Sequence, residues 1–201
     1  MSGGLFLVME GPNGVGKTTT ATRLAERLRE RGRSVHVTSE PSNTPLGRLI
    51  RASESTLSGR ALALAVAADR YKHITDEIQP ALDAGQVVIS DRYVQSSLVL
   101  QRLDGLSLQE IWQYNAQVSP PSLSFYLHHT HEVLQRRLNH RPRLSRLEHD
   151  GSPQQELALY EDAFHFLRER GWHQARIDCQ DLDPNDVVTT LLHHLEHIER
   201  A

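Results

Sequence analysis

Residues 11–18 read Gly-Pro-Asn-Gly-Val-Gly-Lys-Thr, a full match to the pattern G-x-x-x-x-G-K-[ST]. An apolar run at residues 5–9 precedes the motif, and apolar residues at helical spacing follow it, namely Ala21, Leu24, Ala25 and Leu28. The motif therefore lies between a predicted strand and a predicted helix, the context that separates a phosphate-binding loop from an ordinary turn. We predict that the chain binds a nucleoside triphosphate through this loop.

The glycines of the loop explain how it would hold a phosphate. Gly11, Gly14 and Gly16 permit backbone dihedral angles that are closed to other residues, so that successive amide N–H groups turn inward around an anion. The helix that begins at Lys17 directs its unpaired N–H groups and the positive end of its dipole at the same phosphates. Thr18 is placed to ligate Mg²⁺. The predicted nucleotide-binding residues of the loop are Gly11, Asn13, Gly14, Val15, Gly16, Lys17, Thr18 and Thr19.

Length, composition and charge indicate one small domain. With 201 residues, of which 38% are hydrophobic, the chain can bury one core but is short for two, so we expect a single domain over residues 1–201. The formal net charge of −3 gives no field that would attract nucleic acid or an anionic membrane. The single cysteine, Cys179, fits a reducing compartment, and the sequence has neither a membrane-spanning stretch nor a secretion signal. These features predict a cytoplasmic protein that binds neither nucleic acid nor membranes.

Short apolar runs rich in Val, Ile and Leu recur along the chain, separated by longer helical patterns. The runs lie at residues 5–9, 34–38, 87–90 and 123–127, with a weaker one near 175–178. Such alternation requires crossover connections, and hence a parallel sheet with helices on both faces. We therefore predict an α/β fold of the P-loop NTPase type, with a five-stranded parallel sheet.

Two segments depart from the regular alternation. The longest helical pattern covers residues 59–84 and contains Pro80, which predicts a kink or a break. Residues 136–150 are dense in charge, poor in apolar side chains and contain Pro142, so we interpret them as an excursion from the core. In this region we expect a flexible arginine-rich flap, or LID, at about residues 139–152.

A second motif, Asp91-Arg92-Tyr93, follows the apolar run at 87–90. Ligands collect outside the carboxyl ends of the strands in an open parallel sheet, so Asp91 is expected near the phosphate loop and near Mg²⁺. Its carboxylate can hold a metal-bound water, while Arg92 can bridge a donor phosphate and an acceptor anion. A surface ion pair at a strand end is the alternative, which the phosphate loop makes the weaker one. We predict Thr18 and Asp91 as the metal-binding residues.

Basic side chains gather in the predicted excursion, at Arg136, Arg137, Arg141, Arg143 and Arg146. Phosphoryl transfer needs cations and a site closed to water, both of which a mobile arginine-bearing flap supplies. A solvated basic loop explains the same pattern. We favour the flap because the phosphate loop has no arginine of its own.

The histidines invite a metal-site interpretation. His193 and His197 lie four residues apart on a predicted helix and could chelate a metal ion together. No pattern of cysteines or carboxylates offers a third ligand. We therefore interpret the pair as part of a solvated helix face.

The chain resembles the thymidylate kinase family of nucleoside monophosphate kinases over nearly its whole length. The matching segments are residues 10–19, Glu40-Pro41, 44–47, Ile50-Arg51, 68–70, 91–93, Ser96-Ser97, Gln101 and 146–148. The resemblance implies Mg²⁺-dependent transfer of the γ-phosphoryl group of ATP to a pyrimidine nucleoside monophosphate, usually by a homodimer. The helical segment 59–84, rich in Ala and Leu, is a candidate for the dimer surface, although a monomer core explains its composition equally well.

The resemblance also implies roles for single residues on the donor side. The implied catalytic residues are Lys17, Asp91, Arg92, Arg143 and Arg146. Arginines in the flap rather than in the phosphate loop are similar to the bacterial subtype. Contacts to the adenine of ATP would fall near Arg137 and in the loop after Asp178.

On the acceptor side, the resemblance implies a pocket for the nucleoside monophosphate. Arg51 and Arg92 would bind the acceptor phosphate. Arg70, Ser97 and Gln101 would read the base. The implied substrate-binding residues are Glu40, Arg51, Val66, Arg70, Arg92, Ser97, Leu100 and Gln101.

Several positions depart from the family pattern. Val66 stands where the family has a phenylalanine that stacks on thymine, and Leu100 replaces a second aromatic residue. Gln95 replaces an aspartate before the serine pair, and Arg102 replaces a glycine. Asn13 replaces an acidic residue that in the family lies near the sugar 3′-hydroxyl, and its amide can hydrogen-bond but carries no charge. These changes predict a pocket that is less aromatic and reshaped.

The departures bear on the choice of acceptor. Stacking on an aromatic ring contributes about 1–3 kcal/mol, so Val66 predicts weaker thymidylate binding by about tenfold to a hundredfold. Our hypothesis is a kinase with altered or relaxed acceptor choice, for which a modified pyrimidine nucleotide is one candidate. A nucleotide-binding regulator, or a degenerate kinase that phosphorylates no acceptor, is the main alternative, against which Lys17, Asp91 and Arg92 argue. Another P-loop enzyme is less favoured, and the Asn-Lys-x-Asp motif of a guanine-specific switch is absent from the sequence.

Overall fold

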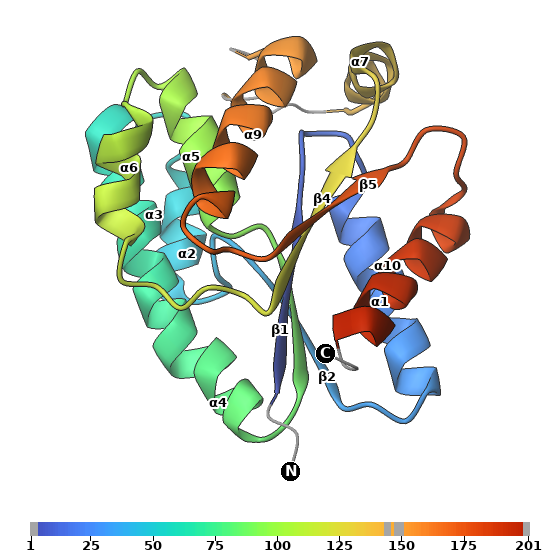
Figure 1. Ribbon diagram of the computed structural model, residues 1–201. Helices are drawn as coiled ribbons and strands as arrows, with labels where there is room; N and C mark the ends of the chain where they lie inside the picture. Colours follow the sequence, from blue (N-terminus) through green and yellow to red (C-terminus); the bar gives the residue numbers. More distant parts are fainter. Residues whose placement is uncertain (1–3, 143–145, 147–150, 199–201) are drawn as a thin grey trace.

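A five-stranded sheet forms the centre of the computed structural model, which describes residues 4–142, 146 and 151–198 (Figure 1). Its strands are β1 (Leu5–Glu10), β2 (Val35–Ser39), β3 (Val87–Asp91), β4 (Leu123–His128) and β5 (Gln174–Asp178). They lie in the order β2-β3-β1-β4-β5, and every neighbouring pair is parallel. The predicted α/β fold with a five-stranded parallel sheet is confirmed.

Helices cover both faces of this sheet (Figure 1). One face packs against α1 (Lys17–Glu30) and α10 (Pro184–Ile198). The other packs against α4 (Gln79–Asp83), α5 (Val94–Leu103), α6 (Leu108–Asn115) and α9 (Pro153–Arg168). The helix α2 (Pro45–Ala52) packs on α3 (Gly59–His73) at the same side, and α7 (His131–Asn139) follows the carboxyl end of β4. None of the helices in the described ranges is both long and apolar enough to cross a membrane.

The central strand β1 explains why the phosphate loop is preceded by an uninterrupted apolar run. Phe6 and Val8 belong to the core on one face, whereas Leu7 and Met9 belong to the core on the other. A parallel strand covered by helices on both faces has no solvent side, so residues 5–9 are all apolar. The phosphate loop therefore begins at the carboxyl end of a buried central strand.

The segment predicted as one helix over residues 59–84 is divided. The helix α3 ends at His73, a turn of π geometry covers Ile74–Ile78, and α4 contains Pro80. Proline cannot donate to the carbonyl four residues earlier, and its ring clashes with that carbonyl in an α-helix. The predicted break is confirmed, and it takes the form of a wider turn directly before the proline.

The prediction of an excursion beginning at residue 136 is wrong at its start. The helix α7 extends to Asn139, because Leu134 and Leu138 are buried at helical spacing. Arg136 and Arg137 therefore lie on a helix and not in a loop. Within the predicted flap, Arg143 lies outside the described residues, as do residues 144–145 and 147–150.

Candidate active site

The phosphate loop lies between β1 and α1 with the backbone conformation that its glycines predict. Gly11, Gly14 and Gly16 have φ angles of 134°, 84° and 107°. Residues with side chains rarely adopt such values, and a Cβ on Gly11 would also collide with the backbone carbonyl of Leu127. Glycine is therefore strongly favoured at these positions, and at Gly11 the close approach of Leu127 leaves no room for a side chain.

Lys17 is folded back over the loop that it follows. Its Nζ donates hydrogen bonds to the carbonyl oxygens of Gly11, at 2.7 Å, and Pro12, at 3.0 Å. The side chain is buried, and this burial, together with the nearby Arg92 guanidinium, lowers the pKa of Lys17 to about 7. Near neutral pH Lys17 is thus partly a charged ammonium and partly a neutral amine.

This pKa predicts that binding of a nucleoside triphosphate takes up a proton. A bound phosphate stabilises the ammonium and raises the pKa of Lys17, so affinity is highest where the free protein is already protonated. Above about pH 7, ATP affinity should fall by up to about tenfold per pH unit. Calorimetric titration at pH 8 in two buffers of different ionisation enthalpy measures the uptake. Lys17→Met should abolish it, and equal heats in both buffers with the unaltered protein would contradict the prediction.

Thr18 and Asp91 lie side by side, as the sequence predicts. The Thr18 Oγ1 donates to Asp91 Oδ2 at 2.5 Å, although the two residues are 73 positions apart. The other carboxylate oxygen, Asp91 Oδ1, is buried and accepts no hydrogen bond from any group in the described part of the chain. A hydroxyl beside a carboxylate with such a buried oxygen fits Mg²⁺, which prefers hard oxygen ligands.

Arg92 turns from the end of β3 toward the phosphate loop. Its φ angle of 80° is rare outside glycine, a strain that costs about 1–3 kcal/mol. Two backbone contacts hold this conformation, a hydrogen bond from Arg92 N to Met9 O at 3.0 Å and one from Ser90 Oγ to Arg92 O at 2.7 Å. The guanidinium then donates to Asn13 Oδ1 at 2.6 Å and to Ser96 Oγ at 3.1 Å.

Glu10 is a buried carboxylate to which the sequence analysis assigned no role. It ends β1 directly before the loop and accepts hydrogen bonds from Tyr93 N, at 2.7 Å, and from Ser96 N and Oγ. Burial raises its pKa, while the hydrogen bond from Ser96 and the charges of Arg92 and Lys17 act in the opposite direction. An acidic residue at the end of an otherwise apolar strand is the signal that could have identified it.

A pocket of about 300 Å³ opens between α2, α3 and α5, beside Arg92. All of the substrate-binding residues predicted above line it. The complete lining is Asn13, Glu40, Pro41, Ile50, Arg51, Glu54, Leu62, Val66, Arg70, Arg92, Tyr93, Ser96, Ser97, Leu100 and Gln101. Its volume lies at the lower end of the range of small-molecule sites.

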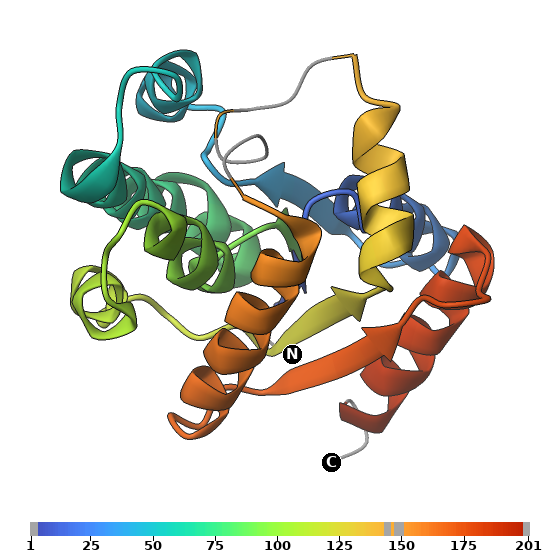
Figure 2. The same cartoon turned by 90° about the horizontal axis from the view of Figure 1, so that it is seen from above.

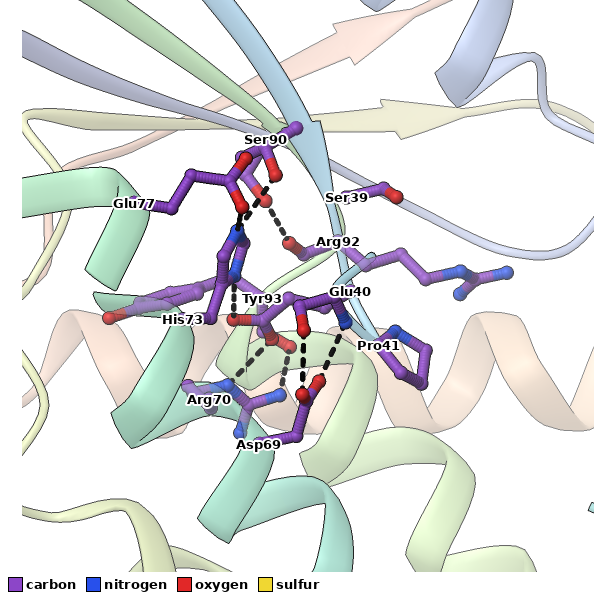
Figure 3. A network of polar contacts seen from close by, with 12 residues as sticks. Ser39, Glu40, Pro41, Asp69, Arg70, His73, Glu77, Ser90, Arg92 and Tyr93 are labelled. Atoms are coloured by element: carbon purple, nitrogen blue, oxygen red, sulfur yellow. Dashed lines mark hydrogen bonds and ion pairs between the residues drawn. The ribbon is translucent and has the colours of Figure 1, made fainter. Parts of the chain in front are cut away.

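Arg70 lies at the base of this pocket, 1% exposed, inside a buried polar network (Figure 3). Its Nε donates to Glu40 Oε2 at 2.7 Å, and its Nη2 donates to Tyr93 O and Ser97 Oγ. A further hydrogen bond from Nη1 goes to Asn115 Oδ1. The guanidinium therefore joins α3, α5 and α6, and most of its donors already have protein partners.

His73 extends the same network away from the pocket (Figure 3). The fully buried ring lies 2.7 Å from Thr38 Oγ1 through Nε2, and 3.4 Å from Glu40 Oε1 through Nδ1. Glu77 lies on its other side. Burial acts to raise the pKa of Glu77, but the hydrogen bonds from Thr38 and His36 outweigh it and lower that pKa. Glu40 is thus held between Arg70 and His73.

Two of the departures from the family pattern lie outside the pocket. Gln95 Nε2 donates to Ser124 Oγ on β4 at 2.8 Å, and Arg102 forms an ion pair with Asp162 at 3.0 Å. Neither residue belongs to the lining. Gln95 and Arg102 therefore form no part of the pocket wall, whereas Val66 and Leu100 do.

The arginines of the predicted flap region lie in different places. Arg137, on α7, donates to the carbonyl oxygens of Gly14 and Val15, so that α7 lies beside the phosphate loop (Figure 2). Arg146 contacts Asp104 through both carboxylate oxygens, at 2.6 and 2.9 Å, and donates to Glu54 O. In this conformation Arg146 thus lies at the α5–α6 connection.

Metal-ligating side chains are dispersed over the described ranges. No group of three or more His, Cys, Asp or Glu side chains there could hold a metal ion. His194 packs edge-on against Phe125 of β4, with ring centres 6.3 Å apart.

Comparison with known proteins gives one consistent result. The sequence pattern of the thymidylate kinase family matches residues 9–160. A probable thymidylate kinase of Pyrococcus abyssi is 46% identical over 132 residues, which are 62% of this chain and 64% of that protein. One of Caldivirga maquilingensis is 38% identical over 148 residues, 72% of each chain. A thymidylate kinase of Thermomicrobium roseum is 49% identical over 112 residues, 53% of this chain and 52% of that protein. The chain thus matches between about half and three quarters of the length of these relatives.

Proposed function

The chain belongs to the thymidylate kinase family, and on this premise we propose that it transfers the γ-phosphoryl group of ATP to a pyrimidine nucleoside monophosphate. One observation carries the proposal. The Arg92 guanidinium contacts Asn13 of the phosphate loop and also lines the pocket beside α3 and α5. A donor site and an acceptor site therefore meet at one arginine, the arrangement that in-line phosphoryl transfer requires.

Each element of the donor site has a chemical role in this proposal. The loop amides and Lys17 would bind the β- and γ-phosphates. Thr18 and Asp91 would hold Mg²⁺, which supplies positive charge against the phosphate oxygens when bound. Arg92 would bridge donor and acceptor phosphates and stabilise the charge that spreads over the transferring group. The acceptor phosphate is already largely ionised at neutral pH, so no general base is needed.

The pocket supports a pyrimidine base that carries a ring N–H. Gln101 is buried, and its Oε1 has no hydrogen-bond donor among the described residues. Leaving such an acceptor unpaired costs free energy, which an N–H of the base would recover. Val66 and Leu100 form an aliphatic wall where a stacking aromatic would otherwise lie. We infer that thymidylate is not strongly preferred and that a base with a larger 5-substituent is accepted.

The direct test is ADP release from ATP and Mg²⁺ with a panel of monophosphates. The panel contains thymidylate, deoxyuridylate, uridylate, cytidylate and a 5-substituted deoxyuridylate. We expect turnover of at least one uracil-type nucleotide, with thymidylate not far ahead of the others. A strong preference for thymidylate would contradict the altered acceptor choice. Binding of ATP without turnover of any acceptor would instead support a nucleotide-binding regulator.

Restoring an aromatic residue at position 66 should favour thymidylate. Because stacking on a ring contributes about 1–3 kcal/mol, Val66→Phe should raise kcat/KM for thymidylate by about tenfold to a hundredfold. Val37→Phe is the matched control, since Val37 undergoes the same change but lies on β2, is 38% exposed and is outside the pocket. An unchanged kcat/KM in Val66→Phe, or an equal rise in the control, would show that stacking is not what the pocket lacks.

We also propose that the protein is a cytoplasmic homodimer, with one domain over residues 1–201 that includes the flap. Large apolar side chains on the adjoining helices α2 and α3 support a dimer surface there, since Leu49 is 61% exposed and Leu64 is 47% exposed. Light scattering at micromolar concentration measures the mass of the assembly. A monomer mass would contradict this part of the proposal.

A further inference from the structure

The side chain of Glu156 joins the phosphate loop to α9, a helix that is distant in the sequence. Asn13 donates two hydrogen bonds to the carboxylate of Glu156, from its backbone N at 2.8 Å and from Nδ2 at 2.9 Å. Glu156 lies in the first turn of α9, 143 positions later in the chain, and both residues are buried. A contact in which both carboxylate oxygens are used and water is excluded is a strong constraint on the loop.

The same asparagine also contacts Arg92. Its Oδ1 accepts the hydrogen bond from Arg92 Nη2 at 2.6 Å. The amide of Asn13 therefore bridges a carboxylate on one side and a guanidinium on the other. Its orientation follows from chemistry, because only the NH₂ end can donate to Glu156 and only the oxygen can accept from Arg92. If the carboxylate of Glu156 were absent, one of the two contacts that fix this orientation would be lost.

The buried negative charge at Glu156 also matches the local cations. It favours the charged forms of Lys17 and Arg92, which lie nearby. The position at the start of α9 is favourable for a carboxylate, since the helix dipole is positive there. Glu156 was not singled out in the sequence, where it is one acidic residue in a polar stretch.

We propose that Glu156 is a positioning residue for phosphoryl transfer: it orients the Asn13 amide, which in turn holds the Arg92 guanidinium between the phosphate loop and the acceptor pocket. The inference rests on the proposed function, because Arg92 must act on the transferring phosphoryl group for its position to matter. Glu156 itself acts only through Asn13. Its effect should therefore appear in kcat more than in the KM for ATP.

An exchange of amide and carboxylate between the two partners tests the proposal. In Asn13→Asp two side-chain carboxylates face each other, and we expect kcat to fall at least about tenfold. In Glu156→Gln one carboxylate oxygen is replaced by an NH₂ group, which cannot accept a hydrogen bond. One of the two donors of Asn13 then has no acceptor, and we expect kcat to fall by about tenfold.

The double variant, Asn13→Asp with Glu156→Gln, restores the pairing in the opposite sense. The new glutamine amide can donate to the new carboxylate at position 13 and accept from the backbone N–H of that position. The same carboxylate still accepts from Arg92. We expect kcat of the double variant to return to within about threefold of the unaltered protein, since every buried group is paired again.

The controls separate positioning from loss of fold. Glu169→Gln changes an exposed glutamate at the carboxyl end of the same helix and should leave kcat unchanged. Thermal unfolding reports the fold of each variant, and ATP titration reports its donor site. If Asn13→Asp does not fold, Glu156→Gln is compared with the double variant alone. The positioning role predicts a higher kcat in the double variant than in Glu156→Gln.

The possible results distinguish failure of the positioning role from failure of the proposed function. An unaltered protein that turns over an acceptor, with a double variant no faster than either single variant, overturns the positioning role alone. A single Asn13→Asp variant as fast as the unaltered protein does the same. If the unaltered protein binds ATP but phosphorylates no acceptor, the proposed function fails, and the positioning role is overturned with it.

Discussion

Replacing Arg92 with alanine is expected to abolish acceptor phosphorylation while ATP binding is retained. The guanidinium contacts Asn13 and Ser96 and lines the acceptor pocket, so it is the cation at the junction of the two sites. An arginine that stabilises a transferring phosphoryl group contributes about 10³–10⁵ to kcat, and we expect a loss of at least about a thousandfold. Coupled ADP release measures kcat, and fluorescence titration with a labelled ATP analogue measures donor binding.

Arg92→Lys serves as the control that keeps the charge. A lysine ammonium is a point charge without the planar fork, and it cannot reproduce contacts to Asn13 and Ser96 in one geometry. We expect it to recover no more than a small part of the lost rate. Activity of Arg92→Ala within tenfold of the unaltered protein would show that the transferring group is stabilised from elsewhere.

Replacing Arg70 with methionine should have the largest effect on stability. Arg70 and Glu40 are 1% and 5% exposed and form an ion pair at 2.7 Å. Removing one partner of a buried ion pair leaves the other charge without compensation, which costs about 3–5 kcal/mol in the free energy of unfolding. Urea denaturation followed by circular dichroism measures this loss.

Arg60→Met is the matched control on the same helix. Arg60 pairs with Glu110 at 2.6 Å, but its side chain is 69% exposed. Exposed ion pairs contribute little to stability, so Arg60→Met should leave the free energy of unfolding almost unchanged. Glu40→Gln combined with Arg70→Met should recover part of the loss, since the buried carboxylate is then replaced by a neutral amide. If Arg70→Met and Arg60→Met destabilise the protein equally, the buried network does not hold the pocket together.

Local patterns in the sequence correctly predicted those parts of the fold that are set by interactions between residues close in sequence. The apolar run of β1, the glycines of the loop and the helix after Lys17 all depend on short-range patterns, and the structure has all three. The break at Pro80 was also predicted, because proline acts on its own turn. The extent of α7 was missed, since only burial shows that Leu134 and Leu138 face the core.

Tertiary structure decided which residues meet in the site. Val66, Leu100, Gln95 and Arg102 are equal as departures in the sequence, yet only the first two line the pocket. A side chain's direction depends on how its helix is rotated against the sheet, and one residue along a helix turns it by about 100°. The likeness to a family supplied the set of pocket residues, which no spacing rule would have grouped.

The sequence by itself thus determined the phosphate loop, the strand–helix alternation and hence a parallel sheet, because each follows from local backbone chemistry and short-range periodicity. The position of Asp91 at a strand end also predicted its meeting with Thr18, which the structure has. Only the tertiary structure showed that Arg92 contacts Asn13 and that Glu156 reaches the loop across 143 positions. These contacts exist because the carboxyl ends of parallel strands, and the helices that follow them, converge at one edge of the sheet. The spatial order of the strands in the sheet, β2-β3-β1-β4-β5, sets that convergence. It depends on how the whole core packs and not on any single segment.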